Sequence, residues 1–265
     1  MSYNIQVGIA TSRRSHYVTG SWKHILPHSQ RLPNLDQAAN LIRDYDIVGL
    51  QELDAGSLRS LYINLAEYLA DRAEFPFWYH QVNRNLGHIA QHSNGLLSHF
   101  KPSEIIDIKL PGLIPGRQAI CAVFDSGEES LALFILHLAL SKRARLQQLD
   151  YLCAMINEFP HAIVMGDLNT LVCSKEMKLL FDKTGLCAPT EELNTFPSWR
   201  PQFHIDHILV SSALEVKSSE VLSHDISDHL PLAMEVILPS GIQLQREEHY
   251  QSLSLEHIRK KYRLS

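Results

Sequence analysis

Short, strongly apolar runs that end in polar residues impose the main constraint on how this chain folds. Leu131–Leu138 is apolar apart from His137, and Ala162–Met165 is followed by Gly-Asp-Leu-Asn at 166–169. Near-continuous apolar runs of this length are typical of strands that are buried on both faces of a sheet. The two segments therefore predict central strands with further layers of structure packed on either side.

Strands outnumber helices among the other segments. Apolar spacing predicts helices at Asn34–Arg43 and Lys142–Phe159, and a further helix that is capped by Ser57 and continues through Ala70. The predicted strands are Asn4–Ile9, Ile47–Leu50, Trp78–Val82, Gly95–Ser98, Ile105–Leu110, Ala119–Phe124, Leu131–Leu138, Ala162–Met165, Ile205–Val210 and Leu230–Leu238. Because neighbouring strands are often hairpin-like and helices are few, we predict an α/β sandwich of two mixed sheets with helices outside, not a doubly wound parallel sheet.

The composition is that of a globular protein with a sizeable core. Of the 265 residues, 45% are apolar and 20% are charged, which excludes disordered, collagen-like and coiled-coil chains. The four cysteines form no Cys-x-x-Cys pair, so we expect a reduced, cytoplasmic protein. No apolar run reaches the roughly 18 residues of a membrane span, and no signal peptide is visible.

The sequence becomes more polar after Pro239. Residues 1–238 are predicted to form one domain, and residues 239–265 a polar tail in which Gln245–Arg263 is either a surface helix or a frayed end. We expect the protein to be a monomer. The formal charge of −5 argues against a non-specific nucleic-acid coat, but it is an average that leaves room for local basic patches.

Chemically reactive side chains stand within or just beyond the apolar runs. These residues are Glu52, His137, Asp167, Asn169, Asp206, His207, Asp228 and His229. Each one alone is commonly a solvated turn residue or a satisfied core histidine. Together they place carboxylates, amides and imidazoles on rigid strands, which is how a scaffold holds a catalytic or metal site.

The order of these motifs along the chain resembles the endonuclease/exonuclease/phosphatase superfamily, whose fold is deoxyribonuclease-I-like. The motifs are Ser-Tyr-Asn-Ile at 2–5, Leu-Gln-Glu at 50–52, Ser-Asn-Gly-Leu-Leu-Ser at 93–98, Leu-His-Leu at 136–138, Gly-Asp-Leu-Asn-Thr at 166–170, Ile-Asp-His-Ile-Leu at 205–209 and Ser-Asp-His-Leu-Pro at 227–231. The resemblance runs from Ser2 to about Leu238. It implies a four-layer α/β sandwich, two packed mixed β-sheets flanked by helices, that acts as a Mg²⁺-dependent phosphoesterase in which Mn²⁺ can substitute.

The resemblance also implies a metal site. Glu52 is expected to be the main Mg²⁺ ligand, because a hard cation prefers carboxylate oxygens. Asn4 and Asp228 are expected to be further ligands, either directly or through water. Asn4 lies only three residues from Met1, so its strand is expected to be unusually short.

The same resemblance assigns catalytic roles to five residues. His229 would contact the scissile phosphate or act as general base, with Asp206 fixing its tautomer. Asp167 would orient or deprotonate the attacking water, a division of labour with His229 that stays open at this point. Asn169 and His137 would donate hydrogen bonds to the phosphoryl oxygens as negative charge develops.

Basic and aromatic residues near these motifs are candidates for substrate binding. No Asp or Glu precedes Asp36, although the stretch contains four Lys and Arg residues, and Phe75–Ser103 is also free of acidic residues. Local positive charge suits a phosphate-bearing substrate. A tryptophan beside an arginine could stack on a base or a sugar, or could equally fill the core. The candidates are Arg13, Arg14, Arg84, Asn94, Arg117 and Trp199.

The sequence leaves the substrate open among nucleic acids, nucleotides, inositol phosphates and sphingolipid-type head groups. The alternative from another class is a catalytically silent relative that binds a phosphorylated ligand or a protein partner. That alternative is disfavoured because every position that the chemistry needs carries a competent residue. Histidine pairs such as His88 and His92 also allow a structural zinc site, but they lack cysteine partners and a His-Glu-x-x-His pattern.

Overall fold

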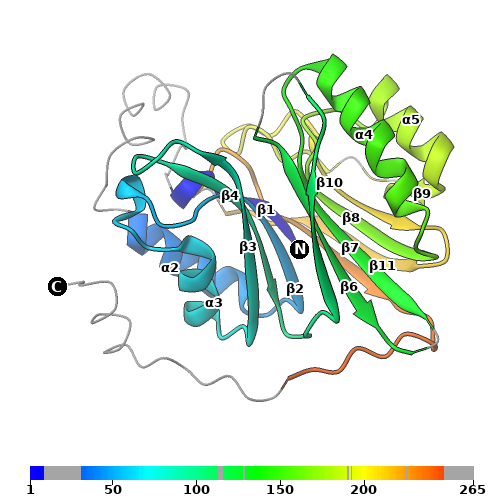
Figure 1. Cartoon of the computed structure of the whole chain (residues 1–265), viewed down its shortest axis with the longest axis horizontal. Helices are drawn as coiled ribbons and strands as arrows, with labels where there is room; N and C mark the ends of the chain where they lie inside the picture. Colours follow the sequence, from blue (N-terminus) through cyan, green and yellow to red (C-terminus); the bar gives the residue numbers. More distant parts are fainter. Residues whose placement is uncertain are drawn as a thin grey trace.

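Two six-stranded sheets pack face to face in the computed structural model of this chain (Figure 1). The structure describes residues 1–8, 31–112, 116–127, 129–189, 191, 193–224 and 226–247. The first sheet has the order β11 (Glu215–Val221), β12 (Leu232–Ile237), β1 (Ser2–Asn4), β2 (Ile47–Asp54), β4 (Gln91–Ser98) and β3 (Phe77–Asn85). The second has the order β5 (Glu104–Lys109), β6 (Gln118–Asp125), β7 (Ser130–His137), β8 (His161–Asp167), β10 (Asp206–Ser211) and β9 (Leu186–Cys187).

Both sheets are mixed, as predicted. The pairs β1–β2 and β7–β8 are parallel, and the other pairs of neighbouring strands are antiparallel. Alternate residues of β7 enter different cores: Phe134 and Leu136 face the helices, whereas Leu133 and Ile135 face the other sheet. This two-sided burial confirms the interpretation of the apolar run at 131–138.

Within the described residues, four α-helices cover the outer faces of the sandwich. The helices α2 (Arg31–Ile42) and α3 (Leu65–Ala73) pack on the first sheet, and α4 (Lys142–Ile156) and α5 (Lys175–Thr184) pack on the second (Figure 1). The α/β four-layer sandwich is therefore confirmed. No helix in the described residues is long and apolar enough to cross a membrane.

Two local predictions were wrong. The strand predicted from Asn4 to Ile9 ends at Asn4, because the chain turns into the short 3₁₀ helix η1 (Gln6–Gly8) with Val7 at a φ of 54°. Ser57 precedes a single 3₁₀ turn, η3 (Leu58–Ser60), rather than a long helix. The helix α3 starts only after Asn64, whose side-chain oxygen accepts hydrogen bonds from two backbone amides of the first turn.

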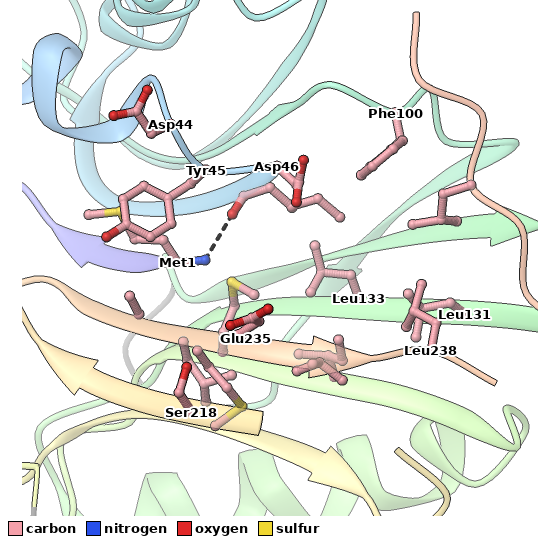
Figure 2. Close-up of a pocket in the computed structure, with 18 of the residues that line it drawn as sticks. Met1, Asp44, Tyr45, Asp46, Phe100, Leu131, Leu133, Ser218, Glu235 and Leu238 are labelled. Atoms are coloured by element: carbon pink, nitrogen blue, oxygen red, sulfur yellow. Dashed lines mark hydrogen bonds between the residues drawn. The ribbon is translucent and has the colours of Figure 1, made fainter. Parts of the chain in front are cut away.

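The short strand β1 leaves space in its own sheet. Beyond Met1, a cavity of about 640 Å³ opens between the ends of β2 and β12 (Figure 2). Its floor is apolar, with Leu131 and Leu133 from the second sheet, and Asp46 and Glu235 stand among the residues at its sides. None of the predicted site residues lines this cavity, which lies at the end of β1 remote from Asn4.

The segment after β12 runs without helix up to residue 247. The backbone of Arg246 forms an isolated antiparallel β-bridge with Phe100. Its guanidinium Nη1 lies 3.6 Å from Asp46 Oδ1. The remainder of the predicted tail, residues 248–265, lies outside the described residues.

Candidate active site

The ends of five central strands bring most of the predicted site residues together. On the second sheet, Asp167 at the end of β8 is in register with His137 of β7 on one side and with Asp206 of β10 on the other. Register partners point to the same face of a sheet, so these three side chains stand in one row. Asn4 of the first sheet reaches across, and its Nδ2 donates a 3.1 Å hydrogen bond to Asp167 Oδ2.

His229 is held in one orientation by its neighbours. Its Nδ1 donates to Asp206 Oδ2 at 2.8 Å, and Thr195 Oγ1 donates to the same oxygen. The ring of Phe196 packs against the imidazole, with the two ring centroids 4.8 Å apart. These contacts direct Nε2 towards Asp167 Oδ2, 3.9 Å away, so the other ring nitrogen is available at the centre of the site.

Glu52 reaches the site through a β-bulge. The pairing of β2 with β4 shifts between Leu50 and Leu53, and Glu52 has a φ of 56°. Such a bulge adds a residue to one strand and redirects its side chain. The Glu52 side chain remains 35% exposed, with Oε1 3.9 Å from His137 Nε2, whereas those of Asp167 and Asp206 are no more than 3% exposed.

The close approach of β8 to β7 beside the site requires a glycine at position 166. Its φ is 143°, and a Cβ placed there would lie 2.0 Å from the backbone oxygen of Leu136. Two residues later, the Asn169 backbone amide donates to Asp167 Oδ1 at 3.0 Å, and Asn169 Nδ2 donates to the backbone oxygen of Leu138 at 3.1 Å. The turn after β8 therefore fixes the Asp167 carboxylate and ties it to the end of β7.

We predict that Gly166→Ala destabilises the protein. Positive-φ strain and overpacking against Leu136 each cost about 1–3 kcal/mol, so the free energy of unfolding should fall by roughly 3 kcal/mol or more. The measurement is chemical denaturation followed by circular dichroism. Gly127→Ala is the matched control, because Gly127 also has a positive φ, 91°, but no atom lies within 4 Å of its added Cβ. A loss for Gly166→Ala no larger than that for Gly127→Ala would contradict the steric argument.

The clustered charges shift the pKa values in opposite directions. Burial raises the pKa of Asp167 to about 7, and the neighbouring Asp206 and Glu52 add to this, against the attraction of His229. Burial lowers the pKa of His229, but Asp206 and Asp167 outweigh it and raise the value to about 10. Burial, followed by the charge of Arg117, holds the pKa of His137 well below its usual range. At neutral pH the site therefore combines a cationic His229 with a neutral His137.

Glu52 and Asp228 are close enough to repel each other. Burial raises the pKa of Glu52, and the charge of Asp228 raises it further. The Asn4 side chain and the nearby cationic groups oppose that rise only in part. A cation bound between these oxygens would relieve the repulsion.

Asp167, Asp206 and His229 also form a group that could hold a metal ion. One ligand atom from each lies within 4.8 Å of the others, and all three residues are buried. The chain therefore offers two neighbouring donor sets that share no residue, this one and the set of Asn4, Glu52 and Asp228.

A cavity of about 520 Å³ leads to these residues. Glu52 and His137 line its inner end, and Arg84 and Arg117 line it as well, so both arginines lie beside the site. Asn94 is fully buried and donates to the backbone oxygen of Gln118 without lining the cavity. Trp199 is half-buried in the loop before β10 and does not line the cavity either. Arg13 and Arg14 lie outside the described residues.

Sequence reasoning missed several residues of the site. Thr195, which donates to Asp206, has no spacing that marks it. Ser227 Oγ donates to the backbone oxygen of Asn4 at 2.7 Å, so the Ser-Asp-His motif also anchors β1. Arg143 and His92 line the cavity, although they lie 51 positions apart in the sequence.

The chain belongs to the endonuclease/exonuclease/phosphatase family, whose sequence model matches residues 1–229. Members of this family are metal-dependent phosphoesterases. No match to a curated protein was found.

Solved structures of several relatives share the fold. A mannosyl-6-phosphatase of Bacteroides thetaiotaomicron superposes with a TM-score of 0.68 at 19% identity, over 89% of this chain and 98% of that one. An endonuclease/exonuclease/phosphatase of Beutenbergia cavernae superposes with a TM-score of 0.69 at 18% sequence identity, over 89% of this chain and 70% of that one. The catalytic domain of human Nocturnin superposes with a TM-score of 0.62 at 18% sequence identity, over 89% of this chain and 92% of that one. At these identities the likeness establishes the deoxyribonuclease-I-like fold.

Proposed function

We propose that this protein is a Mg²⁺-dependent hydrolase that cleaves a phosphate ester by in-line attack of an activated water. The observation that carries the proposal is the buried Asp206–His229 pair, which faces Asp167 beside the half-exposed Glu52 at the inner end of a cavity. A structural role alone does not account for three carboxylates and two imidazoles gathered at one cavity end, because burying such groups costs free energy.

We infer that the metal binds at Glu52, with Asn4 and Asp228, rather than between Asp206 and His229. Mg²⁺ prefers oxygen ligands, which all three residues supply, and keeps several waters, which suits the partly exposed carboxylate of Glu52. Asp206 Oδ2 already accepts hydrogen bonds from Thr195 and His229. When bound, Mg²⁺ would supply electrophilic assistance by polarising a phosphoryl oxygen. Mn²⁺ prefers similar ligands and is expected to substitute.

The protonation states suggest a division of roles. His229, which is cationic at neutral pH, would bind a phosphoryl oxygen through Nε2–H and stabilise the charge that develops there. Asp167, with a pKa near the working pH, would accept the proton of the attacking water at a carboxylate oxygen. As the water oxygen bonds to phosphorus, the bond to the leaving oxygen breaks. The neutral His137 would donate a hydrogen bond to the phosphoryl group.

The test is a substrate panel with purified protein. Oligonucleotides, nucleotides, inositol phosphates and sphingomyelin are incubated with Mg²⁺, with Mn²⁺ and with excess chelator, and released phosphate or leaving group is measured. We expect turnover of at least one class that chelator abolishes and that added Mg²⁺ restores. Turnover that persists in chelator would contradict the metal assignment. Binding of a phosphorylated compound without turnover of any class would favour the catalytically silent alternative.

A further inference from the structure

The cavity that leads to the site is acidic only at its inner end. Glu52 is the single carboxylate among the described residues that line it. The rest of the wall carries three arginines and a histidine: Arg84, Arg117, Arg143 and His92. This distribution gives the space beyond the metal-binding residues a strong positive potential.

The three arginines that line the cavity come from different elements. Arg84 is on β3, Arg117 immediately precedes β6, and Arg143 is in the first turn of α4. The turn at Gly116 packs directly on Arg84, since a Cβ added to Gly116 would lie 3.0 Å from Arg84 Cβ. Both sheets and a helix therefore contribute to one basic wall, an arrangement that only the folded chain creates.

The wall has no direct ion pair within the described part of the chain, although the charges of Asp167 and Glu52 act on Arg117 from the site. Arg84, Arg117 and Arg143 form no ion pair there, whereas the nearby Arg145 pairs with Glu176 at 2.8 Å. Arg84 and Arg143 are exposed at the cavity wall and Arg117 is partly buried, so the three guanidinium groups are available to an anion that enters the cavity.

The start of α4 supports the same interpretation. Its first turn contains no acidic residue but carries Lys142 and Arg143. Cations are unfavourable at a helix N-terminus, where the macrodipole is positive, so this placement costs helix stability. An anion bound beside Arg143 would convert that cost into a favourable interaction. The stability of α4 therefore does not explain why an arginine stands at position 143, whereas the binding of an anion does.

Two buried polar atoms in the cavity wall make no hydrogen bond within the described residues, Ser93 Oγ and Asn83 Oδ1. Ser93 is 1% exposed, and its Oγ makes no hydrogen bond within the described residues. A buried hydroxyl without a partner is costly in a folded protein. A ligand oxygen in the cavity could accept the Ser93 hydrogen bond, which adds an uncharged donor to the basic wall.

We propose that this basic wall binds a second phosphate group carried by the same molecule whose phosphate ester is hydrolysed. The inference rests on the proposed function and narrows its substrate class to small molecules with two phosphates. The cavity volume of about 520 Å³ lies within the range of small-molecule sites, and the overall charge of −5 does not favour a polyanionic polymer. A substrate with a single phosphate and an otherwise neutral structure would have no negatively charged group for the basic wall to bind.

The experiment compares two chromogenic probes that differ only in the second phosphate. They are the 4-nitrophenyl ester of thymidine 3′-phosphate and the same compound with an additional 5′-phosphate, both assayed with Mg²⁺. We expect the second phosphate to raise kcat/KM of the wild-type protein about tenfold or more, the effect of one good charged hydrogen-bonded contact. The ratio should fall towards one in the double variant R84Q/R143Q.

Lys142→Gln is the matched control. It removes one positive charge from the same helix turn, but Lys142 lies 4.0 Å from Glu176 and does not line the cavity. This variant should keep the wild-type ratio. Equal kcat/KM for the two probes in the wild-type protein would overturn the proposal, and so would a ratio that R84Q/R143Q leaves unchanged. A trinucleotide cleaved far better than the bisphosphate probe would overturn the small-molecule class.

A binding measurement separates this inference from the proposed function. Thymidine 3′,5′-bisphosphate is titrated calorimetrically into the protein in excess chelator, where no turnover occurs. We expect the Kd of R84Q/R143Q to be about tenfold weaker than that of the wild-type protein. If no compound of the substrate panel is hydrolysed but this difference is found, the proposed function fails and the anion site stands. If hydrolysis is found but the binding is equal, the anion site fails alone.

Discussion

Replacing Glu52 by glutamine is expected to lower Mg²⁺-dependent turnover by about 100-fold or more at limiting Mg²⁺. The amide keeps the shape of the side chain but removes the charge that would hold the cation, and a catalytic metal contributes several kcal/mol. Glu52 is half-exposed at a bulge and packs in no core cluster, so the fold should persist. The measurement is kcat/KM across a Mg²⁺ titration, together with calorimetric titration of Mn²⁺.

Glu235→Gln is the control for this variant. Glu235 is an exposed carboxylate that pairs with Lys217 on the first sheet, so its loss changes the net charge equally without touching the site. Near-wild-type turnover of Glu52→Gln at limiting Mg²⁺ would show that the metal binds elsewhere. The first place to look would then be the buried group of Asp167, Asp206 and His229.

Asp167→Asn and His229→Ala should each lower kcat by about 10²–10⁴-fold while KM changes far less. Both residues are assigned to events in the transition state, namely proton acceptance and stabilisation of developing charge. Steady-state kinetics on the best substrate of the panel measures kcat and KM separately for each variant. Asn157→Ala is a suitable control, because Asn157 caps the far end of α4. A variant of Asp167 or His229 that raises KM alone would instead be a binding residue.

The pH dependence offers a second readout on the same residues. Asp167 must be deprotonated to accept a proton, and its pKa is raised to about 7, so turnover should rise with pH up to that region. His229 must keep its proton, and its pKa is raised to about 10, so turnover should fall above that pH. We expect the acid limb to be lost in Asp167→Asn. Added Mg²⁺ should move that limb to lower pH in the wild-type protein, since a nearby cation favours the carboxylate.

Several features of this protein could be predicted from local sequence because local physics decides them. The two-sided burial of β7 follows from its composition, since a strand with apolar side chains on both faces is stable only between two layers. The ordered motifs from Glu52 to His229 indicated which residues meet, because strand ends are where a scaffold presents polar side chains. The family and its fold could therefore be predicted from residues that lie far apart in the chain.

Other elements carry little local signal. The strand β11 is largely polar and exposed at a sheet edge, so its pattern does not distinguish it from a loop. The helix that was predicted from Ser57 is replaced by a turn around Asp54, whose carboxylate accepts hydrogen bonds from Ser57 and Ser60 and pairs with Arg59. In that segment, local side-chain hydrogen bonds to the buried Asp54 carboxylate outweigh the helical spacing of the apolar residues.

Motif order and apolar patterning were enough to predict which chemical groups form the site and which layers carry them. The geometry of the site depends on how the chain packs: Asn4 crosses between the sheets to Asp167, a bulge turns Glu52 towards the cavity, and Arg143 of a helix lines that cavity together with Arg84 of the first sheet. The physical reason is that composition and periodicity report the burial of each residue, whereas distances between remote residues depend on strand register and sheet packing. Those are set by the summed contacts of the whole core.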